Sequence, residues 1–236
     1  MLKLSTRLQI VYDMVPSCNT LADVGCDHGY LSIALLQNNI VSKAIAMDVN
    51  KGPLAKAKEN LQLAGLSDRS ELRLSDGLAK LGESEADVIC ICGMGGALIG
   101  RIINAGINVA KSAKCLILEP QSEYYQLREL LMKEGFVILD EELTTEENKI
   151  YPIIKLYYEP DSSKRILYSD AQLEYGPLII EKKPELLNTL LSKNEGEYTS
   201  ILSKLEQGNS ATDAIKNRCQ ELRKELELIR QIKNSL

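Results

Sequence analysis

A chain of 236 residues with a mass of 26.2 kDa has room for one ordinary domain and an appendage, which excludes a larger multidomain assembly. Hydrophobic residues make up 44% of the sequence and charged residues 26%, so the chain can bury a core and is neither disordered nor fibrous. The net charge of -5 argues against a protein that coats nucleic acid through overall positive charge, but it leaves room for a local basic patch.

The start of the chain and its cysteines indicate the compartment. The sequence opens with Met-Leu-Lys and shows no apolar leader for export. Six cysteines are scattered along it, and we expect a reducing, cytoplasmic environment. No stretch approaches the roughly 20 apolar residues that a membrane helix needs, so we expect no membrane partner.

Cys90 and Cys92 form a C-x-C pair, which raises the question of a metal site. No second pair accompanies them and the chain has a single histidine, whereas zinc sites need a fuller ligand set at defined spacing. We therefore expect no metal, and we interpret both cysteines as small apolar residues on one face of a strand.

Short β-rich runs alternate with longer amphipathic stretches between residues 20 and 158, which predicts βαβ units. Runs such as 88–92 are continuously apolar, as is typical of parallel strands covered by helices on both faces. Residues 143–150 are too few for a crossover helix, so the last two strands should form an antiparallel hairpin. The sequence thus predicts an open, doubly wound α/β sheet of five parallel strands plus a terminal β-hairpin. The predicted strands are Thr20–Val24, Ala44–Val49, Ser70–Leu74, Asp87–Cys92, Cys115–Leu118, Phe136–Glu142 and Tyr151–Tyr158.

The pattern changes beyond Pro160, where leucines at helical spacing replace the strand-like runs. We predict two domains, residues 1–160 and 161–236, the second formed by an antiparallel helical hairpin of coiled-coil character. Between its helices, the predicted C-cap is Gly208, and the candidate N-caps of the next helix are Ser210, Thr212 and Asp213.

The segment from Leu21 to Tyr30 carries the most information about ligands. Gly25 and Gly29 permit a tight turn and close approach of a ligand, and the following helix offers N–H groups at its N-terminus. The spacing is not that of a dinucleotide G-x-G-x-x-G motif, because Asp27 takes the place of the middle glycine. A carboxylate there disfavours a diphosphate and favours a ligand with a cationic centre or an amino group.

Two further acidic residues follow the next strands. Asp48 ends the second predicted strand, at the spacing of a residue that accepts both hydroxyls of a ribose. Asp76 follows the third strand, where it could receive the exocyclic amine of a purine or, alternatively, cap a turn. Open α/β sheets bind ligands at the carboxyl ends of their strands, so we expect a ligand at this edge.

The run from Asp23 to Gly29 resembles the D-x-G-x-G-x-G motif of class I S-adenosylmethionine-dependent methyltransferases, with the departure at Asp27. More narrowly, an ordered set of segments over nearly the whole chain resembles the bacterial tRNA (adenine-22-N1)-methyltransferase family. These segments are Asp23 to Tyr30, Lys51-Gly52-Pro53, Asp76-Gly77-Leu78, Gly93-Met94-Gly95-Gly96, Leu118-Glu119-Pro120-Gln121 and Tyr175-Gly176-Pro177. The resemblance implies a Rossmann-like methyltransferase sheet, S-adenosyl-L-methionine as cofactor and tRNA as substrate.

The resemblance also implies a set of cofactor-binding residues. Arg7 should pair with the carboxylate of the methionine moiety, unless it is a solvated helix arginine. His28 should have a structural role or line the cofactor rather than act as a general base. The full set is Arg7, Asp23, Gly25, Cys26, Asp27, His28, Gly29, Asp48, Val49, Asp76, Gly77, Gly93, Met94 and Gly95.

The implied chemistry needs alignment more than base catalysis, because adenine N1 carries a lone pair and no proton. An acceptor near the exocyclic amine would stabilise the transition state, and the candidates are the Gly93 carbonyl and the Asp27 carboxylate. Tyr30 could stack on the adenine or could simply pack beside the cofactor. Residues 93–96 are Gly-Met-Gly-Gly, whereas many methyltransferases that act on base amines have Asn-Pro-Pro-Tyr at this position. We therefore expect backbone groups to hold the base. The alternative is that the glycines serve tight packing.

Residues 1–160 hold 16 basic and 21 acidic side chains, whereas residues 161–236 hold 12 of each. In the final predicted helix, six basic side chains face only Glu221, Glu225 and Glu227. We expect this helix to grip the tRNA backbone, with a solvated helix face as the alternative. The predicted RNA-binding residues are Lys216, Arg218, Arg223 and Lys224.

Two other functions stay open at this point. The chain could methylate a different substrate, or it could be a catalytically silent nucleotide-binding module that recruits a partner through its helical hairpin. We expect a monomer or a weak homodimer formed through paired hairpins.

Overall fold

The computed structural model describes residues 3–207 and 212–236. The chain divides into two compact units, Met1–Leu167 (unit 1) and Tyr168–Leu236 (unit 2), each described by itself. The division follows Leu167 rather than Pro160 because the intervening segment packs on unit 1. Arg165 donates from Nε to the Glu159 carbonyl at 3.3 Å, and its guanidinium lies against Gly135.

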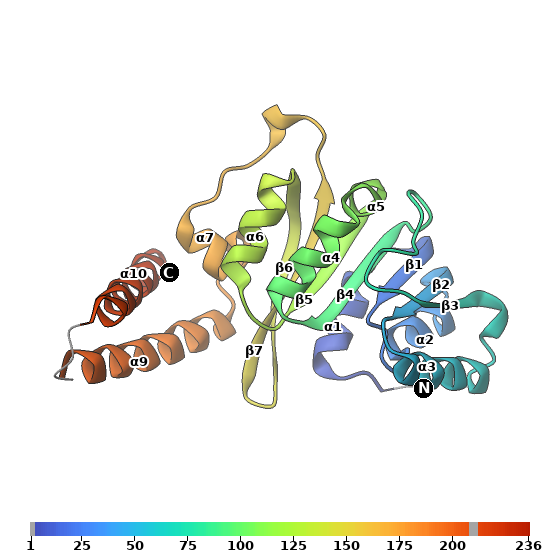
Figure 1. Ribbon diagram of the computed structural model, residues 1–236, viewed down its shortest axis with the longest axis horizontal. Coiled ribbons are helices and arrows are strands. Elements are labelled where there is room, and N and C mark those ends of the chain that lie inside the picture. The colour runs from blue at the N-terminus through green and yellow to red at the C-terminus, as the bar shows by residue number, and fades with distance from the viewer. Residues whose placement is uncertain (1–2, 208–211) are drawn as a thin grey trace. The chain divides into compact units, whose positions relative to one another are not determined.

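Unit 1 contains a seven-stranded sheet in the order β3-β2-β1-β4-β5-β7-β6 (Figure 1). The pairs among β1 to β5 are parallel, and β7 is antiparallel to both β5 and β6. The prediction of five parallel strands and a terminal hairpin is therefore confirmed. The strands are β1 Cys18–Val24, β2 Val41–Asp48, β3 Ser70–Leu74, β4 Val88–Met94, β5 Cys115–Pro120, β6 Phe136–Glu146 and β7 Lys149–Tyr158.

The hairpin strands are longer than predicted. β6 continues to Glu146 and β7 begins at Lys149, so a two-residue turn joins them. Both turn residues, Glu147 and Asn148, have positive φ, at 49° and 62°, as a type I′ turn requires. The polar stretch that looked like a loop is therefore strand, in which one side faces solvent and ladder pairing satisfies the backbone.

Helices lie on both faces of this sheet (Figure 1). One hydrophobic cluster joins α1, α2 and α3 to the sheet, while α4 and α6 contact each other. The helices of unit 1 are α1 Thr6–Met14, α2 Tyr30–Gln37, α3 Lys51–Leu63, α4 Gly96–Ala105, α5 Ile107–Ser112 and α6 Tyr124–Lys133, with 3-10 turns at Ser67–Arg69 and Ser162–Lys164.

Unit 2 consists of two short helices, α7 Asp170–Tyr175 and α8 Pro177–Lys182, and two long ones, α9 Glu185–Gln207 and α10 Asp213–Ser235. Ion pairs join Glu195 to Lys233 and Glu206 to Arg223. Because the residue number rises on α9 as it falls on α10, the two helices run antiparallel, as the sequence predicted.

The α10 N-cap is Thr212, whose hydroxyl accepts a hydrogen bond from the Ile215 amide, so Asp213 belongs to the helix itself. The predicted caps Gly208 and Ser210 lie outside the described residues. In the described ranges, no helix is long and apolar enough to cross a bilayer, and no group of three or more His, Cys, Asp or Glu side chains could hold a metal ion.

Candidate cofactor and substrate site

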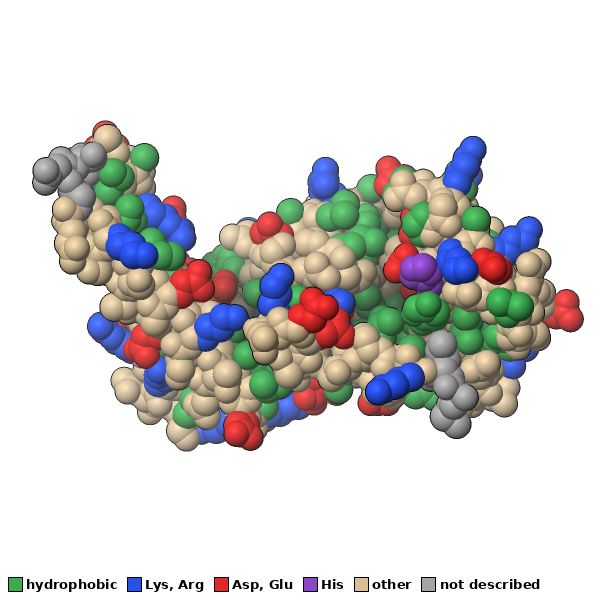
Figure 2. Space-filling view, turned by 90° about the horizontal axis from the view of Figure 1, so that it is seen from below, with side chains coloured by type: hydrophobic (Ala, Val, Ile, Leu, Met, Phe, Trp, Pro, Cys, Tyr) green, Lys and Arg blue, Asp and Glu red, His purple; other side chains and the backbone are tan. Residues whose placement is uncertain are grey.

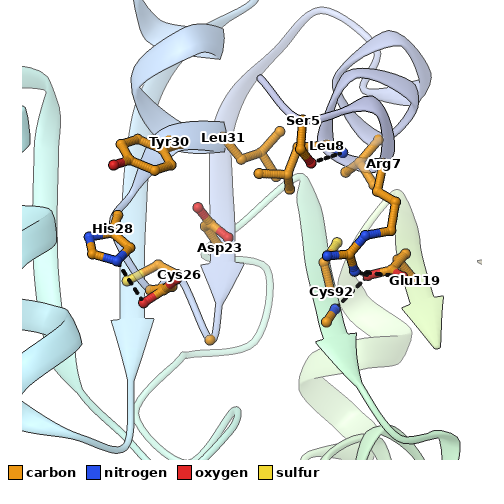
Figure 3. Close-up of a pocket in the computed structure, with 14 residues that line it drawn as sticks. Ser5, Arg7, Leu8, Asp23, Cys26, His28, Tyr30, Leu31, Cys92 and Glu119 are labelled. Atoms are coloured by element: carbon orange, nitrogen blue, oxygen red, sulfur yellow. Dashed lines mark hydrogen bonds and ion pairs between the residues drawn. The ribbon is translucent and has the colours of Figure 1, made fainter. Parts of the chain in front are cut away.

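A pocket opens at the carboxyl ends of β1, β4 and β5, where the strand order changes direction between β1 and β4. Open α/β sheets bind ligands at this kind of position. Its walls come from α1, the β1–α2 turn, and the ends of β4 and β5 (Figure 3). The cavity volume of about 160 Å³ is below the roughly 300–1,000 Å³ of pockets that enclose a drug-sized ligand. The cavity therefore fits one end of a larger ligand.

The β1–α2 turn is left-handed at three residues, Gly25 (φ 75°), Asp27 (φ 47°) and Gly29 (φ 72°). The amides of Gly25 and Cys26 both donate to the Met47 carbonyl, at 2.8 and 3.0 Å, and thereby fix the turn to β2. A Cβ on Gly29 would lie 3.2 Å from the Ala57 Cβ, so this glycine lets α3 approach the turn. Gly25 and Cys26 line the pocket.

Asp23 is a buried carboxylate at the end of β1, and it faces the pocket. It accepts a hydrogen bond of 2.7 Å from the Ser32 hydroxyl. Burial raises the pKa of Asp23 to about 6, although the hydrogen bonds from Ser32 act in the opposite direction. Because Asp23 has a neutral hydrogen-bond donor, a cationic group bound nearby would stabilise its charged form.

His28 and Tyr30 lie at one side of the pocket (Figure 3), and Asp27 forms a group with them. The His28 ring stacks on the Tyr30 ring, with centroids 5.3 Å apart and planes 13° from parallel. The Asp27 carboxylate lies 3.5 Å from His28 Nε2, and Asn60 donates to the His28 carbonyl at 3.0 Å. Tyr30 is 40% exposed, and Figure 2 shows His28, the single histidine, at the surface of the molecule.

Arg7 lies in the opposite wall, on α1, and is not a solvated helix arginine. Its Nε donates to Glu146 at 2.5 Å and its Nη1 lies 3.2 Å from both carboxylate oxygens of Glu119. The guanidinium also sits over the Tyr151 ring, 4.9 Å from its centroid. Figure 3 shows Asp23 between this wall and the side formed by His28 and Tyr30.

Glu119 is a pocket residue to which sequence reasoning gave no role. Its side chain is 2% exposed, and its Oε2 accepts the Gly93 amide at 2.7 Å. Burial raises the pKa of Glu119, while Arg7 and the Gly93 amide lower it. The available signal was an acidic residue at the end of an otherwise apolar strand, next to Pro120. Cys92, interpreted from sequence as a strand residue, also lines the pocket.

The glycine-rich run 93–96, which joins the end of β4 to α4, serves two purposes. Gly93 has a φ of 75°, lines the pocket, and would place a Cβ 3.9 Å from Gln121 Nε2, its sole close neighbour among the described atoms. Gly96 in contrast would place a Cβ 2.5 Å from the Ser122 carbonyl oxygen, so tight packing explains it. The Met94 side chain lies over Gly25, where a Cβ would come 2.2 Å from Met94 Cε. Gly95 precedes α4 and is its N-cap.

Seven predicted cofactor residues do not line this cavity. Three of them, Gly29, Met94 and Gly95, are next to lining residues or to one another in the chain, and the other four lie further along the sheet. Asp48 ends β2 and Val49 comes directly after it, while Asp76 and Gly77 follow β3 at the same edge of the sheet. The Asp48 carboxylate accepts the Asn50 amide at 2.7 Å, and Gly77 lies against Ile102 with a φ of 52°. The predicted site is thus divided between a pocket beneath α1 and an open edge beside it.

The four predicted RNA-binding residues all lie on α10, and each makes an ion pair within unit 2. The prediction that the basic residues of this helix face only three glutamates was wrong, because α7, α9 and the first turn of α10 supply further carboxylates. The pairs are Lys216–Asp213 at 3.4 Å, Arg218–Glu221 at 2.9 Å, Arg223–Glu206 at 2.7 Å and Lys224–Asp170 at 2.6 Å. All four cationic side chains remain more than half exposed.

Comparison with known proteins shows to which family the chain belongs. Residues 4–154 match the family model described as a methyltransferase domain. The tRNA (adenine(22)-N(1))-methyltransferase of Bacillus subtilis strain 168 is 32% identical over 232 residues, which cover 98% of this chain and 97% of the relative. The crystal structure of the B. subtilis m1A22 tRNA methyltransferase TrmK superposes with a TM-score of 0.89 at 32% identity, covering 98% of this chain and 99% of that one.

The crystal structure of the Streptococcus pneumoniae protein Sp1610 in complex with S-adenosyl-L-methionine matches with a TM-score of 0.81 at 30% identity. The match covers 98% of this chain and 99% of that one. Sequence and fold agree over both units, including the helical tail. The chain therefore belongs to the tRNA (adenine(22)-N(1))-methyltransferase family, as the motifs from Asp23 to Pro177 indicated.

Proposed function

We propose that this chain transfers the methyl group of S-adenosyl-L-methionine to N1 of adenine 22 in tRNA. The observation that carries the proposal is a match at 32% identity over 98% of the chain to a protein with this activity. The pocket supports it, because it lies at the switch point of the sheet, where open α/β sheets bind ligands, and beside an exposed aromatic ring.

The residues present fit the cofactor. Arg7 offers a cation to the carboxylate of its methionine part, and Asp23 offers a buried carboxylate to its positive charge. Asp48, at the end of β2, is our candidate acceptor for the ribose hydroxyls, and Asp76, after β3, is our candidate acceptor for the purine amine. When bound, S-adenosyl-L-methionine supplies an electrophilic methyl group on a sulfonium centre.

The chain's own contribution to transfer is to align the base and exclude water. Tyr30, supported from behind by His28, offers a ring on which adenine can stack. The Gly93 carbonyl and the Asp27 carboxylate are the candidate acceptors for the adenine amine, which becomes more acidic as positive charge reaches the ring. The open space beside Gly93 allows a base to come close.

The test of the function is incubation with labelled S-adenosyl-L-methionine and unmodified tRNA, followed by nucleoside analysis. We expect 1-methyladenosine from a tRNA with adenine at position 22 and none from the same tRNA with guanine there. Absence of 1-methyladenosine from the first would overturn the proposal. In the same assay Asp27→Asn should slow transfer, and near-normal turnover would leave Gly93 as the remaining acceptor.

The tRNA grip is a separate proposal that rests on the exposed cations of α10. Intramolecular surface ion pairs contribute little, so phosphates can replace the carboxylates that now face Lys216, Arg218, Arg223 and Lys224. Changing all four to Ala should weaken tRNA binding and reduce the salt slope by roughly 0.7–0.9 for each phosphate that the helix no longer neutralises.

A charge-matched control is available in unit 1. Lys43, Lys111, Lys114 and Lys133 also make ion pairs with carboxylates, so their replacement by Ala removes the same net charge from elsewhere. If both quadruple variants lose the same affinity across a salt series, general charge rather than α10 holds the tRNA. We further propose a cytoplasmic enzyme that is a monomer or a weak homodimer, which sedimentation at several protein concentrations tests.

A further inference from the structure

Glu119 joins three elements around the pocket. It stands at the carboxyl end of β5, accepts a hydrogen bond of 2.7 Å from the amide of Gly93 near the end of β4, and pairs with Arg7 of α1 at 3.2 Å. Its side chain is 2% exposed. Burying a carboxylate to this extent costs free energy unless hydrogen bonds and an opposite charge compensate. Movement of the carboxylate or of either partner would break these contacts and restore that cost, so the contacts restrict where all three groups can lie.

We propose that Glu119 is a positioning residue for methyl transfer, which holds the Gly93 peptide where the target base requires it and the Arg7 guanidinium where the cofactor requires it. This inference rests on the proposed function and deepens it. Neither partner is held by local structure alone. Gly93 lies at an irregularity in the β4–β5 pairing between Cys92 and Met94, and Arg7 is held through its side chain.

The hydrogen bond from the Gly93 amide to Glu119 determines which backbone group of Gly93 can contact a base. Because the Gly93 N–H is engaged by Glu119, the backbone group left to face an adenine amine is the carbonyl, which is an acceptor. Gly93 has a φ of 75° and open space beside it, so its own chain restrains it weakly. A hydrogen bond to an ionised group is about twice as strong as a neutral one, and it can fix the orientation of this peptide.

Glu146 provides a matched control. It binds the same guanidinium, through Arg7 Nε at 2.5 Å, but its hydrogen bonds go to Arg7 and Ser5 and not to Gly93. Variants of Glu119 and Glu146 therefore both remove support from Arg7, and only the Glu119 variants remove support from Gly93. A difference between them reports on the hydrogen bond to Gly93.

The kinetic experiment measures kcat and KM for tRNA, and the dissociation constant of S-adenosylhomocysteine, in the full-length protein. Glu119→Ala should lower kcat by about 10²-fold, the order expected when reacting groups shift by about 1 Å. Glu119→Gln keeps an acceptor for the Gly93 amide and should recover much of that loss. Glu146→Ala should act mainly on the S-adenosylhomocysteine dissociation constant and lower kcat less than Glu119→Ala.

Equal losses of kcat in Glu119→Ala and Glu146→Ala, or a loss confined to cofactor binding, would overturn the proposal. Should Glu119→Ala fail to fold, Glu119→Asp takes its place. Its shortened side chain should no longer reach the Gly93 amide. The kcat of Glu119→Asp should therefore be lower than that of Glu119→Gln.

A second readout does not depend on tRNA. In protein labelled with ¹⁵N-glycine, the Gly93 amide proton should move upfield and exchange faster with solvent in Glu119→Ala, and should stay in place in Glu146→Ala. An unchanged Gly93 amide in Glu119→Ala would remove the basis of the proposal. If the wild-type protein makes no 1-methyladenosine, the proposed function fails, while this measurement still reports whether Glu119 positions Gly93.

Discussion

Asp23 shows how burial changes the chemistry of a single side chain. Its pKa is about 6 in the fold against an ordinary 3.8, mainly because burial penalises the charged form. The folded carboxyl therefore holds its proton at pH values where the unfolded one has lost it. The free energy of unfolding consequently falls as pH rises from about 4 to about 6, and this penalty is fully present above that window.

Asp23→Asn should remove the penalty. At pH 7.5 we expect the variant to be more stable than wild type by up to about 3 kcal/mol, since each pKa unit corresponds to about 1.4 kcal/mol. The difference should shrink towards pH 4.5, and urea unfolding at several pH values measures it. The same variant should bind S-adenosylhomocysteine more weakly. A stability difference that does not change with pH would contradict this account of Asp23.

Sequence reasoning was most specific for residues that are close together in the chain. Asp27, His28 and Tyr30 share one turn, so a local motif brings them together. Glu119 contacts Gly93, which is 26 positions away in the sequence, and Arg7, which is 112 positions away. Such contacts depend on strand order and register, which a local motif does not contain, and so its partnership with Arg7 and Gly93 could not be derived from spacing.

At the scale of elements, α4 starts against the loop before α6, and its first residue must be small. A Cβ on Gly96 would lie 2.5 Å from the Ser122 carbonyl oxygen and 2.7 Å from that of Glu123. Gly96→Ala should therefore cost about 1–3 kcal/mol, the usual effect of overpacking. Chemical denaturation measures the loss.

Gly100, one turn further along α4, is the matched control. A Cβ there would lie 3.6 Å from Leu130 Cδ1, an ordinary contact, and alanine is the better helix former by up to about 1 kcal/mol. Gly100→Ala should leave stability unchanged or raise it. A loss in Gly100→Ala as large as that in Gly96→Ala would show that helix position rather than the contact with residues 122 and 123 matters.

Strands and long helices followed from sequence pattern, whereas short elements did not. The parallel strands were apparent because buried β-branched runs leave little ambiguity. Helices α7 and α8, of six residues each, are too short to show a helical period. Their signals were local, namely the capping box of Ser169 and Gln172 and the break at Gly176 before Pro177.

At the scale of the whole molecule, every residue that lines the pocket belongs to unit 1. A fragment of residues 1–167 should therefore bind S-adenosylhomocysteine within about threefold of the full chain, as expected of a compact unit with its own core. It should bind tRNA more weakly if α10 supplies the grip. Calorimetry and a tRNA binding assay check the two parts, and full tRNA affinity in the fragment would relocate the grip to unit 1.

Counting the charges of each segment did not predict which acidic side chains pair with the basic residues of α10. With the division after Leu167, unit 2 holds 10 basic and 11 acidic side chains, because Asp161, Lys164 and Arg165 belong to unit 1. The acidic partners of α10 come from other helices of the unit, such as Glu206 of α9 and Asp170 of α7. Net charge along a sequence does not show which charges meet, so any grip on RNA requires that these ion pairs exchange partners.

The contact between Arg7 and Glu146 joins residues 139 positions apart, and this separation has a consequence for synthesis. At about 5–20 residues per second, Arg7 is added to the chain roughly 7 to 30 seconds before Glu146 is. The wall of the pocket that carries Arg7 is completed only after the β6–β7 hairpin has emerged. A nascent chain thus acquires its cofactor site near the end of the synthesis of unit 1, although the glycine-rich turn appears near the start.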